Sequence, residues 1–180
     1  RHPVDELHEG HAEFEIRRDG VLLSTEEKAE LVAGILRAMS LTRQFAPIVL
    51  LVGHGSSTRN NPHAAGLDCG ACGGQTGSVN VRVLAYLLND SEVRSALAEQ
   101  GLDIPLETRF IGALHDTTTD EVVCAGQVPQ EIFDFIRQAG QQARRERAGR
   151  LGLGSDADID RAIKRRSQDW SEVRPEWGLA

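Results

Sequence analysis

A continuous apolar run from Ala46 to Val52 constrains the fold of this chain more than any other feature. It contains valine, isoleucine and leucine without polar alternation, which is typical of a strand buried on both faces in a parallel sheet. A glycine-rich polar segment follows directly from Gly53. Ligands gather at the carboxyl ends of strands in open α/β sheets. We therefore expect a functional site here, with His54 just past the end of the strand.

Helical patterns lie on both sides of this strand. Ser24 and Glu27 have the spacing of a capping box, which predicts a helix over about 25–40 that leads into the strand. After the glycine-rich segment, apolar residues at helical intervals predict a second helix around 79–87. A short helix, capped by the polar residues before it, is expected to follow and to end near residue 101.

The second half of the chain continues this alternation. Residues 106–113 predict another strand, and its exit over 115–120 is a polar loop that we expect at the same sheet edge as His54. Pro129 suits the first turn of a further helix, which the glycine at 149 and those after it should end. A shorter helix is expected from Ser155 onwards.

These elements predict an α/β fold with a mostly parallel sheet flanked by helices. We expect residues 1–180 to form a single part of one larger domain, with 1–23 and 150–180 peripheral to it. The chain opens on Arg1 without a methionine and closes on a stretch with two tryptophans that ought to pack against something. The expectation is therefore an incomplete excerpt of a longer protein.

Composition narrows the class of function. The net charge is −7, from 27 acidic and 20 basic residues, which argues against binding to nucleic acid, since that requires a basic face. No run approaches the 18 apolar residues of a membrane span, so any membrane association is expected to be peripheral. Three cysteines are too few for a disulfide scaffold and indicate a reducing compartment, the cytosol by default.

His54, Cys69 and Cys72 place three common zinc ligands within nineteen positions of a flexible loop. Three alternatives are open at this point. His54 can instead bond to backbone in a tight turn while the cysteines are buried as small apolar side chains. Cys69 and Cys72 can form a redox dithiol, although such pairs usually open a helix directly after a strand. A cysteine–histidine nucleophile is the third alternative.

Other polar clusters allow both a functional and a structural interpretation. Residues 73–77 could present backbone amides to an anion, although no P-loop pattern is present. His115, with Asp116 and Asp120, suits either a group that supports a nearby site or a turn in which aspartates cap backbone amides. The arginines between 144 and 166 are typical of a solvated helix face, but they also suit an acidic partner or an anionic membrane surface.

Several of these motifs together resemble one family. They are Gly53-His54-Gly55-Ser56, Asn60-Asn61-Pro62, Asp68-Cys69-Gly70-Ala71-Cys72-Gly73-Gly74, His115-Asp116-Thr117-Thr118-Thr119-Asp120 and Arg174-Pro175-Glu176-Trp177-Gly178-Leu179-Ala180. Each is uncommon, and the combination resembles the DabA family. That family supplies a subunit of an energy-coupled uptake system for inorganic carbon, which works with the membrane subunit DabB.

The resemblance implies a zinc (Zn2+) site and a fold similar to those of β-carbonic anhydrases, with hydration of CO2 to bicarbonate as the reaction. It assigns His54 and Cys69 as metal ligands, and takes the remaining ligands from an upstream Cys-x-Asp-x-Arg motif. That motif does not occur here, so this sequence would carry half a site and would be inactive alone unless Cys72 adds a third ligand.

The resemblance further implies peripheral attachment at the cytoplasmic face of the inner membrane. The alternative function is a non-catalytic zinc-binding or protein-interaction module, in which the metal only holds the loop together.

Overall fold

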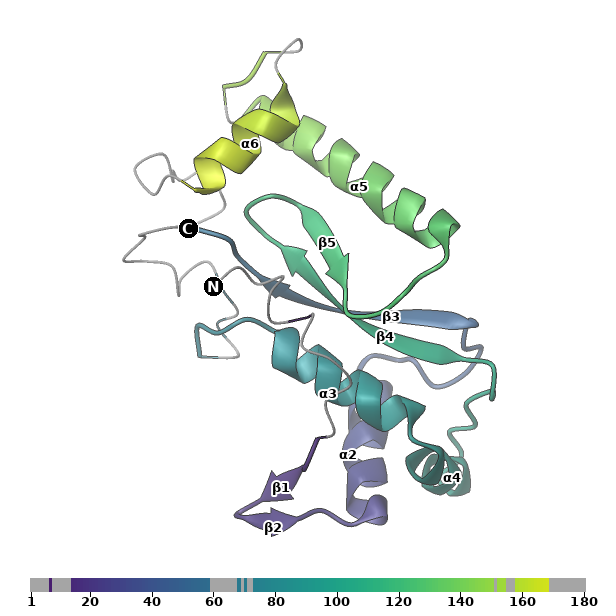
Figure 1. Cartoon of the computed structure of the whole chain (residues 1–180). Helices are drawn as coiled ribbons and strands as arrows, with labels where there is room; N and C mark the ends of the chain where they lie inside the picture. The colour runs from purple at the N-terminus through teal and green to yellow at the C-terminus, as the bar shows by residue number, and fades with distance from the viewer. Residues whose placement is uncertain are drawn as a thin grey trace.

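The computed structural model describes residue 7 and the ranges 14–58, 68, 70, 73–150, 152–154 and 158–168. Helices and strands alternate along the chain, as expected for an α/β protein (Figure 1). The elements are β1 (Arg17–Arg18), β2 (Val21–Leu22), α2 (Thr25–Ala38), β3 (Ile48–Gly55), α3 (Ser78–Asn89), α4 (Ser91–Glu99), β4 (Arg109–Asp116), β5 (Glu121–Cys124), α5 (Gln130–Ala148) and α6 (Ile159–Ser167).

The predicted capping box forms at the start of α2. The Ser24 hydroxyl accepts a hydrogen bond from the Glu27 amide at 3.2 Å, and the Ser24 amide donates to the Glu27 carboxylate at 2.9 Å. The start of the helix is therefore confirmed, because two amides that the helix leaves unpaired are satisfied reciprocally. Asp90 caps α4 by accepting from the amides of Glu92 and Val93.

The main sheet has the order β3-β4-β5. β3 and β4 are parallel, whereas β4 and β5 are antiparallel, so the expectation of a mostly parallel sheet is corrected to a mixed one. The polar segment after β4 is a tight turn, closed by a bond of 2.8 Å from the Asp120 amide to the Asp116 carbonyl. Asp120 has a φ of 56°, and this left-handed conformation reverses the chain into β5.

A small antiparallel hairpin, β1 with β2, precedes α2. Its turn uses Asp19 and Gly20, whose φ values are 52° and 83°. Two positive φ values match the twist of the flanking strands in a two-residue hairpin turn. The sequence pattern of this segment did not predict either strand.

Both predicted strands of the main sheet exist, with shifted boundaries. β3 runs on to Gly55, so His54 belongs to the strand and does not follow it. β4 begins at Arg109, three residues later than expected, and Leu106 lies outside it with 94% of its surface exposed. The buried stretch of β4 starts at Phe110.

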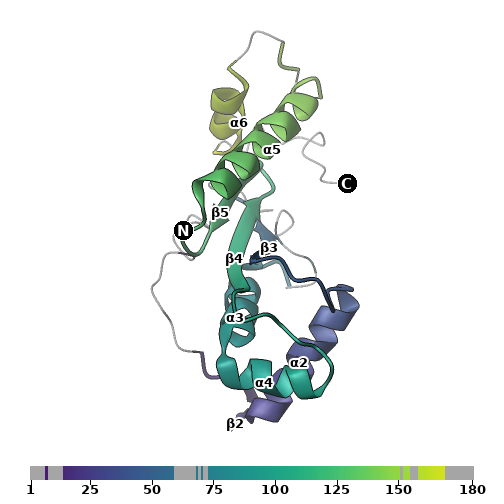
Figure 2. The same ribbon diagram turned by 90° about the vertical axis from the view of Figure 1, so that its right-hand side faces the viewer.

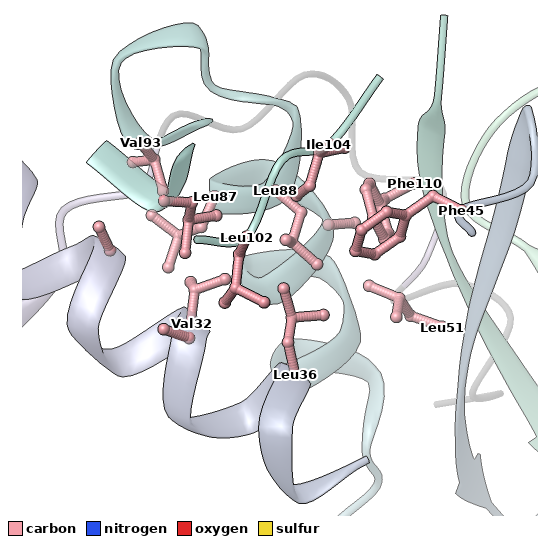
Figure 3. Close-up of a cluster of buried hydrophobic side chains, with 14 of the residues drawn as sticks. Val32, Leu36, Phe45, Leu51, Leu87, Leu88, Val93, Leu102, Ile104 and Phe110 are labelled. Carbon is pink, nitrogen blue, oxygen red and sulfur yellow. The ribbon is translucent and has the colours of Figure 1, made fainter. Parts of the chain in front are cut away.

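One face of the sheet carries the hydrophobic core. α2, α3 and α4 lie on this side, and α5 and α6 lie on the other (Figures 1 and 2). Figure 3 shows leucines and valines of the three helices packed against Leu51 of β3 and Phe110 of β4. Full burial of each such side chain contributes about 1.5–3 kcal/mol.

The opposite face is covered more thinly. Of the nineteen residues of α5, only Arg144 and Ala148 are buried. Val52, on β3, is 52% exposed. Across the part of the chain that the structure describes, no helix combines the length and apolar character needed to cross a membrane.

Candidate functional site

The site expected from the sequence lies where β3 and β4 end together. Gly55 is the register partner of Asp116, and His54 is the partner of His115. Partners in a parallel pair direct their side chains to the same face of the sheet. The two polar segments therefore do share one sheet edge, as predicted. His54 is exposed, and the His115 side chain is 36% exposed.

A buried carboxylate, that of Asp116, joins the two strand exits. It accepts hydrogen bonds from the Ser57 hydroxyl at 2.5 Å and the Thr118 hydroxyl at 2.6 Å, and from the amides of Ser57, Thr118 and Thr119 at 2.9–3.3 Å. The Thr118 hydroxyl also contacts the Ser57 carbonyl at 2.9 Å. Since all these groups are buried, the loop after β3 and the turn after β4 are fixed to one another.

A second carboxylate, that of Asp68, is held close to His54. It accepts hydrogen bonds from the Ser56 amide at 2.8 Å and the Ser56 hydroxyl at 3.0 Å. Burial raises the pKa of Asp68, and the two bonds from Ser56 and the neighbouring His54 offset this only in part. The chain therefore returns to the end of β3 at the residue that precedes Cys69.

The turn after β4 holds the His115 ring through Asp120. Its Nε2 lies 3.3 Å from the Asp120 Oδ1, and the second Asp120 oxygen forms an ion pair with Arg147. Burial acts to raise the pKa of Asp120, but the contacts with His115 and Arg147 outweigh it, so the pKa is lowered overall. Asp120 therefore stays ionised and orients the imidazole.

α5 is fixed on this turn by three positions on one helix face, Gly140, Arg144 and Arg147. The Arg144 guanidinium donates to the carbonyls of Thr119 and Asp120 at 3.3 Å and to Asp160 of α6 at 2.6 Å. Arg144 is only 8% exposed. The interpretation of these arginines as a solvated face is thus wrong for Arg144 and Arg147. Their spacing from Gly140, four and seven residues, is the signal that could have indicated a buried face.

Glycines let the start of α3 approach the end of β3. The Gly77 amide donates to the His54 carbonyl at 2.8 Å. A β-carbon on Gly53 would lie 3.0 Å from both the Gly77 carbonyl oxygen and a Val81 methyl group. Larger residues at position 53 would therefore push the helix away from the strand that carries His54.

The two predicted zinc ligands are not equally placed by the structure. His54 lies at the expected sheet edge, whereas Cys69 and Cys72 lie outside the described residues. Among the residues that are described, no group of three or more histidine, cysteine, aspartate or glutamate side chains is arranged to hold a metal ion. The Asp116 carboxylate caps backbone amides of the turn, as the structural interpretation predicted, whereas the Asp120 carboxylate contacts His115 and Arg147 instead. Ser57, to which the sequence analysis gave no role, bonds to Asp116 through both its amide and its hydroxyl, as Thr118 does.

Comparison with known proteins identifies the family. The model of the family described as "Probable inorganic carbon transporter subunit DabA" matches residues 2–180. A protein of that name from Hydrogenovibrio crunogenus is 53% identical over 171 residues, which are 93% of this chain and 21% of that protein. One from Marinomonas sp. is 48% identical, over 99% of this chain and 23% of that protein.

A protein named DabA2 from Halothiobacillus neapolitanus is 50% identical over 92% of this chain. The chain thus spans about a fifth of the length of these relatives. No solved structure matches it, so a fold like that of β-carbonic anhydrases stays a prediction. The family match over nearly every residue, together with identities near 50%, shows that this chain belongs to the DabA family.

Proposed function

We propose that this chain carries two ligands of a zinc centre, His54 and Cys69, in a subunit that takes part in the uptake of inorganic carbon. The observation that carries the proposal is the pair of hydrogen bonds from Ser56 to Asp68, at 2.8 and 3.0 Å. They hold Asp68, which precedes Cys69, against Ser56, which follows His54 by two residues in the sequence. Imidazole and thiolate are usual zinc ligands, so the donor chemistry suits this metal.

The state of the His54 ring supports the same assignment. The side chain is exposed at the end of β3, and within the described residues no hydrogen bond involves its ring nitrogens. Because the ring is exposed, water can satisfy these nitrogens, and no protein group among the described residues occupies them. Both ring nitrogens of His54 are therefore available to a metal.

The proposed reaction is the hydration of CO2 to bicarbonate. Bound zinc would supply a Lewis acid that makes water nucleophilic near neutral pH. The residues of this chain would bind the metal through His54 and Cys69, while Asp116 fixes the loop that leads away from His54. Two ligands do not complete a zinc site, and the resemblance places the others, a cysteine and an aspartate, elsewhere in the longer polypeptide.

The partners are proposed on the same basis. The relatives are named as transporter subunits, and the resemblance implies a membrane subunit of the DabB type. We expect the protein to be peripheral, at the cytoplasmic face of the inner membrane, with CO2 and bicarbonate as substrate and product. Copurification of the full-length protein with the membrane subunit would test this partner directly.

The test of the zinc centre is metal content and inorganic-carbon uptake of variants of the full-length protein. His54→Ala and Cys69→Ala should each lose zinc and uptake, because loss of a ligand removes both charge and geometry. Cys72→Ala should keep most of both. Cys124→Ala is the matched control, since Cys124 lies half-buried in β5 opposite Ala113, away from the carboxyl ends of β3 and β4.

Each outcome has a separate meaning. Normal zinc content in Cys69→Ala would exclude this cysteine as a ligand. Loss of zinc with normal uptake would leave the metal assignment in place and exclude the proposed reaction. Metal spectroscopy that finds four protein ligands and no open position would favour a structural zinc site.

A further inference from the structure

We infer that the outer edge of β3 pairs with a parallel β-strand contributed by a part of the longer DabA polypeptide that precedes α2. Within the described residues β3 is hydrogen-bonded as a strand to β4 alone. The inference rests on this edge and holds whether or not His54 binds zinc.

The hydrogen bonds at the two ends of the β3–β4 ladder define which backbone groups are unpaired. The Arg109 amide donates to the Pro47 carbonyl at 2.9 Å, and the Thr117 amide donates to the Gly55 carbonyl at 2.8 Å. Alternation along a parallel ladder then directs the odd-numbered residues of β3 toward β4. The amides and carbonyls of Leu50 and Val52 therefore point to the outer edge.

The side chains of β3 are those of an interior strand. Ile48 to Val52 contains no charge and no proline, which are the usual protection of an edge strand against unwanted pairing. Val52 is 52% exposed, whereas its register partner Ala113 in β4 is fully buried. A long apolar edge of this kind is expected to be covered in the intact protein.

The topology gives the side and the direction of the missing strand. α3 lies between β3 and β4 in sequence, and α2 lies on the same face of the sheet (Figure 1). Crossovers between parallel strands are right-handed in about 98% of cases. A strand connected to β3 through α2 would therefore lie parallel to β3, on the side opposite β4.

Neither the described residues before α2 nor the sequence of residues 1–16 indicates such a strand. β1 and β2 are two residues long and pair with each other, and residues 1–16 contain no apolar run. The matched part is 21% of the length of the Hydrogenovibrio crunogenus relative, so most of the polypeptide lies elsewhere. On this edge the His54 carbonyl already accepts from the Gly77 amide at 2.8 Å, so a parallel strand would pair with β3 as far as Val52. Its following loop would then lie at the same sheet edge as His54.

Amide hydrogen exchange on the full-length protein, read at single residues by mass spectrometry, tests the pairing. The amides of Leu51 and Gly53 are internal controls because they bond to β4 in any case. Leu50 and Val52 should exchange within about tenfold of these controls if the edge is paired. Exchange of Leu50 and Val52 more than about a hundredfold faster than the controls would overturn the inference.

Photocrosslinking identifies the strand that is paired. Val52 is replaced by the photoreactive residue p-benzoylphenylalanine in the full-length protein, with Leu106, which is 94% exposed, as the control position. The expected product joins Val52 to a peptide of the same polypeptide that precedes residue 1. A crosslink to residues 1–180, to a second isotopically labelled copy or to another subunit would overturn the inference, as would a yield no higher than that at Leu106. If the substituted protein does not fold, the exchange experiment decides, since it uses the unsubstituted protein.

Discussion

Gly140 of α5 lies so close to Asp120 that a β-carbon at position 140 would stand 2.6 Å from the Asp120 carbonyl oxygen. That oxygen belongs to the backbone of a tight turn and has no rotamer that would relieve the contact. Gly140→Ala should therefore destabilise the protein by about 1–3 kcal/mol, although alanine gains about 1 kcal/mol over glycine in a helix. Thermal unfolding of the variant measures the difference.

Gly34 in α2 is the matched control for this substitution. A β-carbon there would meet no atom within 4 Å, so Gly34→Ala should be neutral or stabilising by about 0.5–1 kcal/mol. Equal effects of the two substitutions would show that α5 does not rest on the turn as described.

Asp120→Asn should lower stability in a pH-dependent way. The pKa of Asp120 is lowered in the folded protein, so its contribution is complete above the unfolded value of about 3.9 and is lost as pH falls through the folded value. The variant should be less stable than the parent at neutral pH, and the difference should close below about pH 4. Asparagine tolerates the positive φ of this position, so the substitution isolates the charge.

Denaturant titrations across pH would measure this effect, with Asp103→Asn as the control because Asp103 is exposed. A difference between the Asp120 variant and the parent that does not change with pH would contradict the role given to the contacts with His115 and Arg147.

Asp116→Ala should be among the more damaging substitutions of a single polar residue. It leaves the buried hydroxyls of Ser57 and Thr118 and their amides without the acceptor that they share, and each unsatisfied group costs about 1–3 kcal/mol. Unfolding by urea would measure the loss, with the exposed residue Glu107 replaced by alanine as the control. A loss no greater than that of Glu107→Ala would mean that water replaces the carboxylate.

The 180-residue chain by itself should bind zinc weakly and should not hydrate CO2 measurably. His54 and Cys69 supply two ligands, and recruitment of Cys72 is the only local route to a third. Chelator competition followed by a stopped-flow assay tests this expectation. Tight binding with rapid hydration would show that the site is complete within these residues.

The sequence was sufficient for the elements whose signals are local. The uninterrupted apolar run predicted β3, and the spacing of Ser24 and Glu27 predicted the start of α2. The sequence also predicted that the polar segments after β3 and β4 meet at one edge of the sheet, because parallel strands end on the same side. The sequence did not predict that β3 continues through His54, since the glycines on either side of His54 have no strand preference.

Contacts between residues distant in sequence determine the β4–β5 hairpin and the position of α5. No glycine marks the turn before β5, and Asp120 adopts the left-handed conformation itself. Arg144 carries no local sign of burial, since its partners Thr119, Asp120 and Asp160 are 16 to 25 residues away. Such burial is decided by tertiary packing and not by helical pattern alone.

The two sheet faces are covered unequally, and this affects which part of the protein unfolds locally. α2, α3 and α4 share a common apolar core with β3 and β4, whereas α5 is held on the turn largely by ion pairs and hydrogen bonds to backbone. Segments with few buried apolar contacts have the lowest free energy of local unfolding. We therefore expect α5 and α6 to detach first on local unfolding, which would free Asp120 and His115 while the layer behind His54 stays folded.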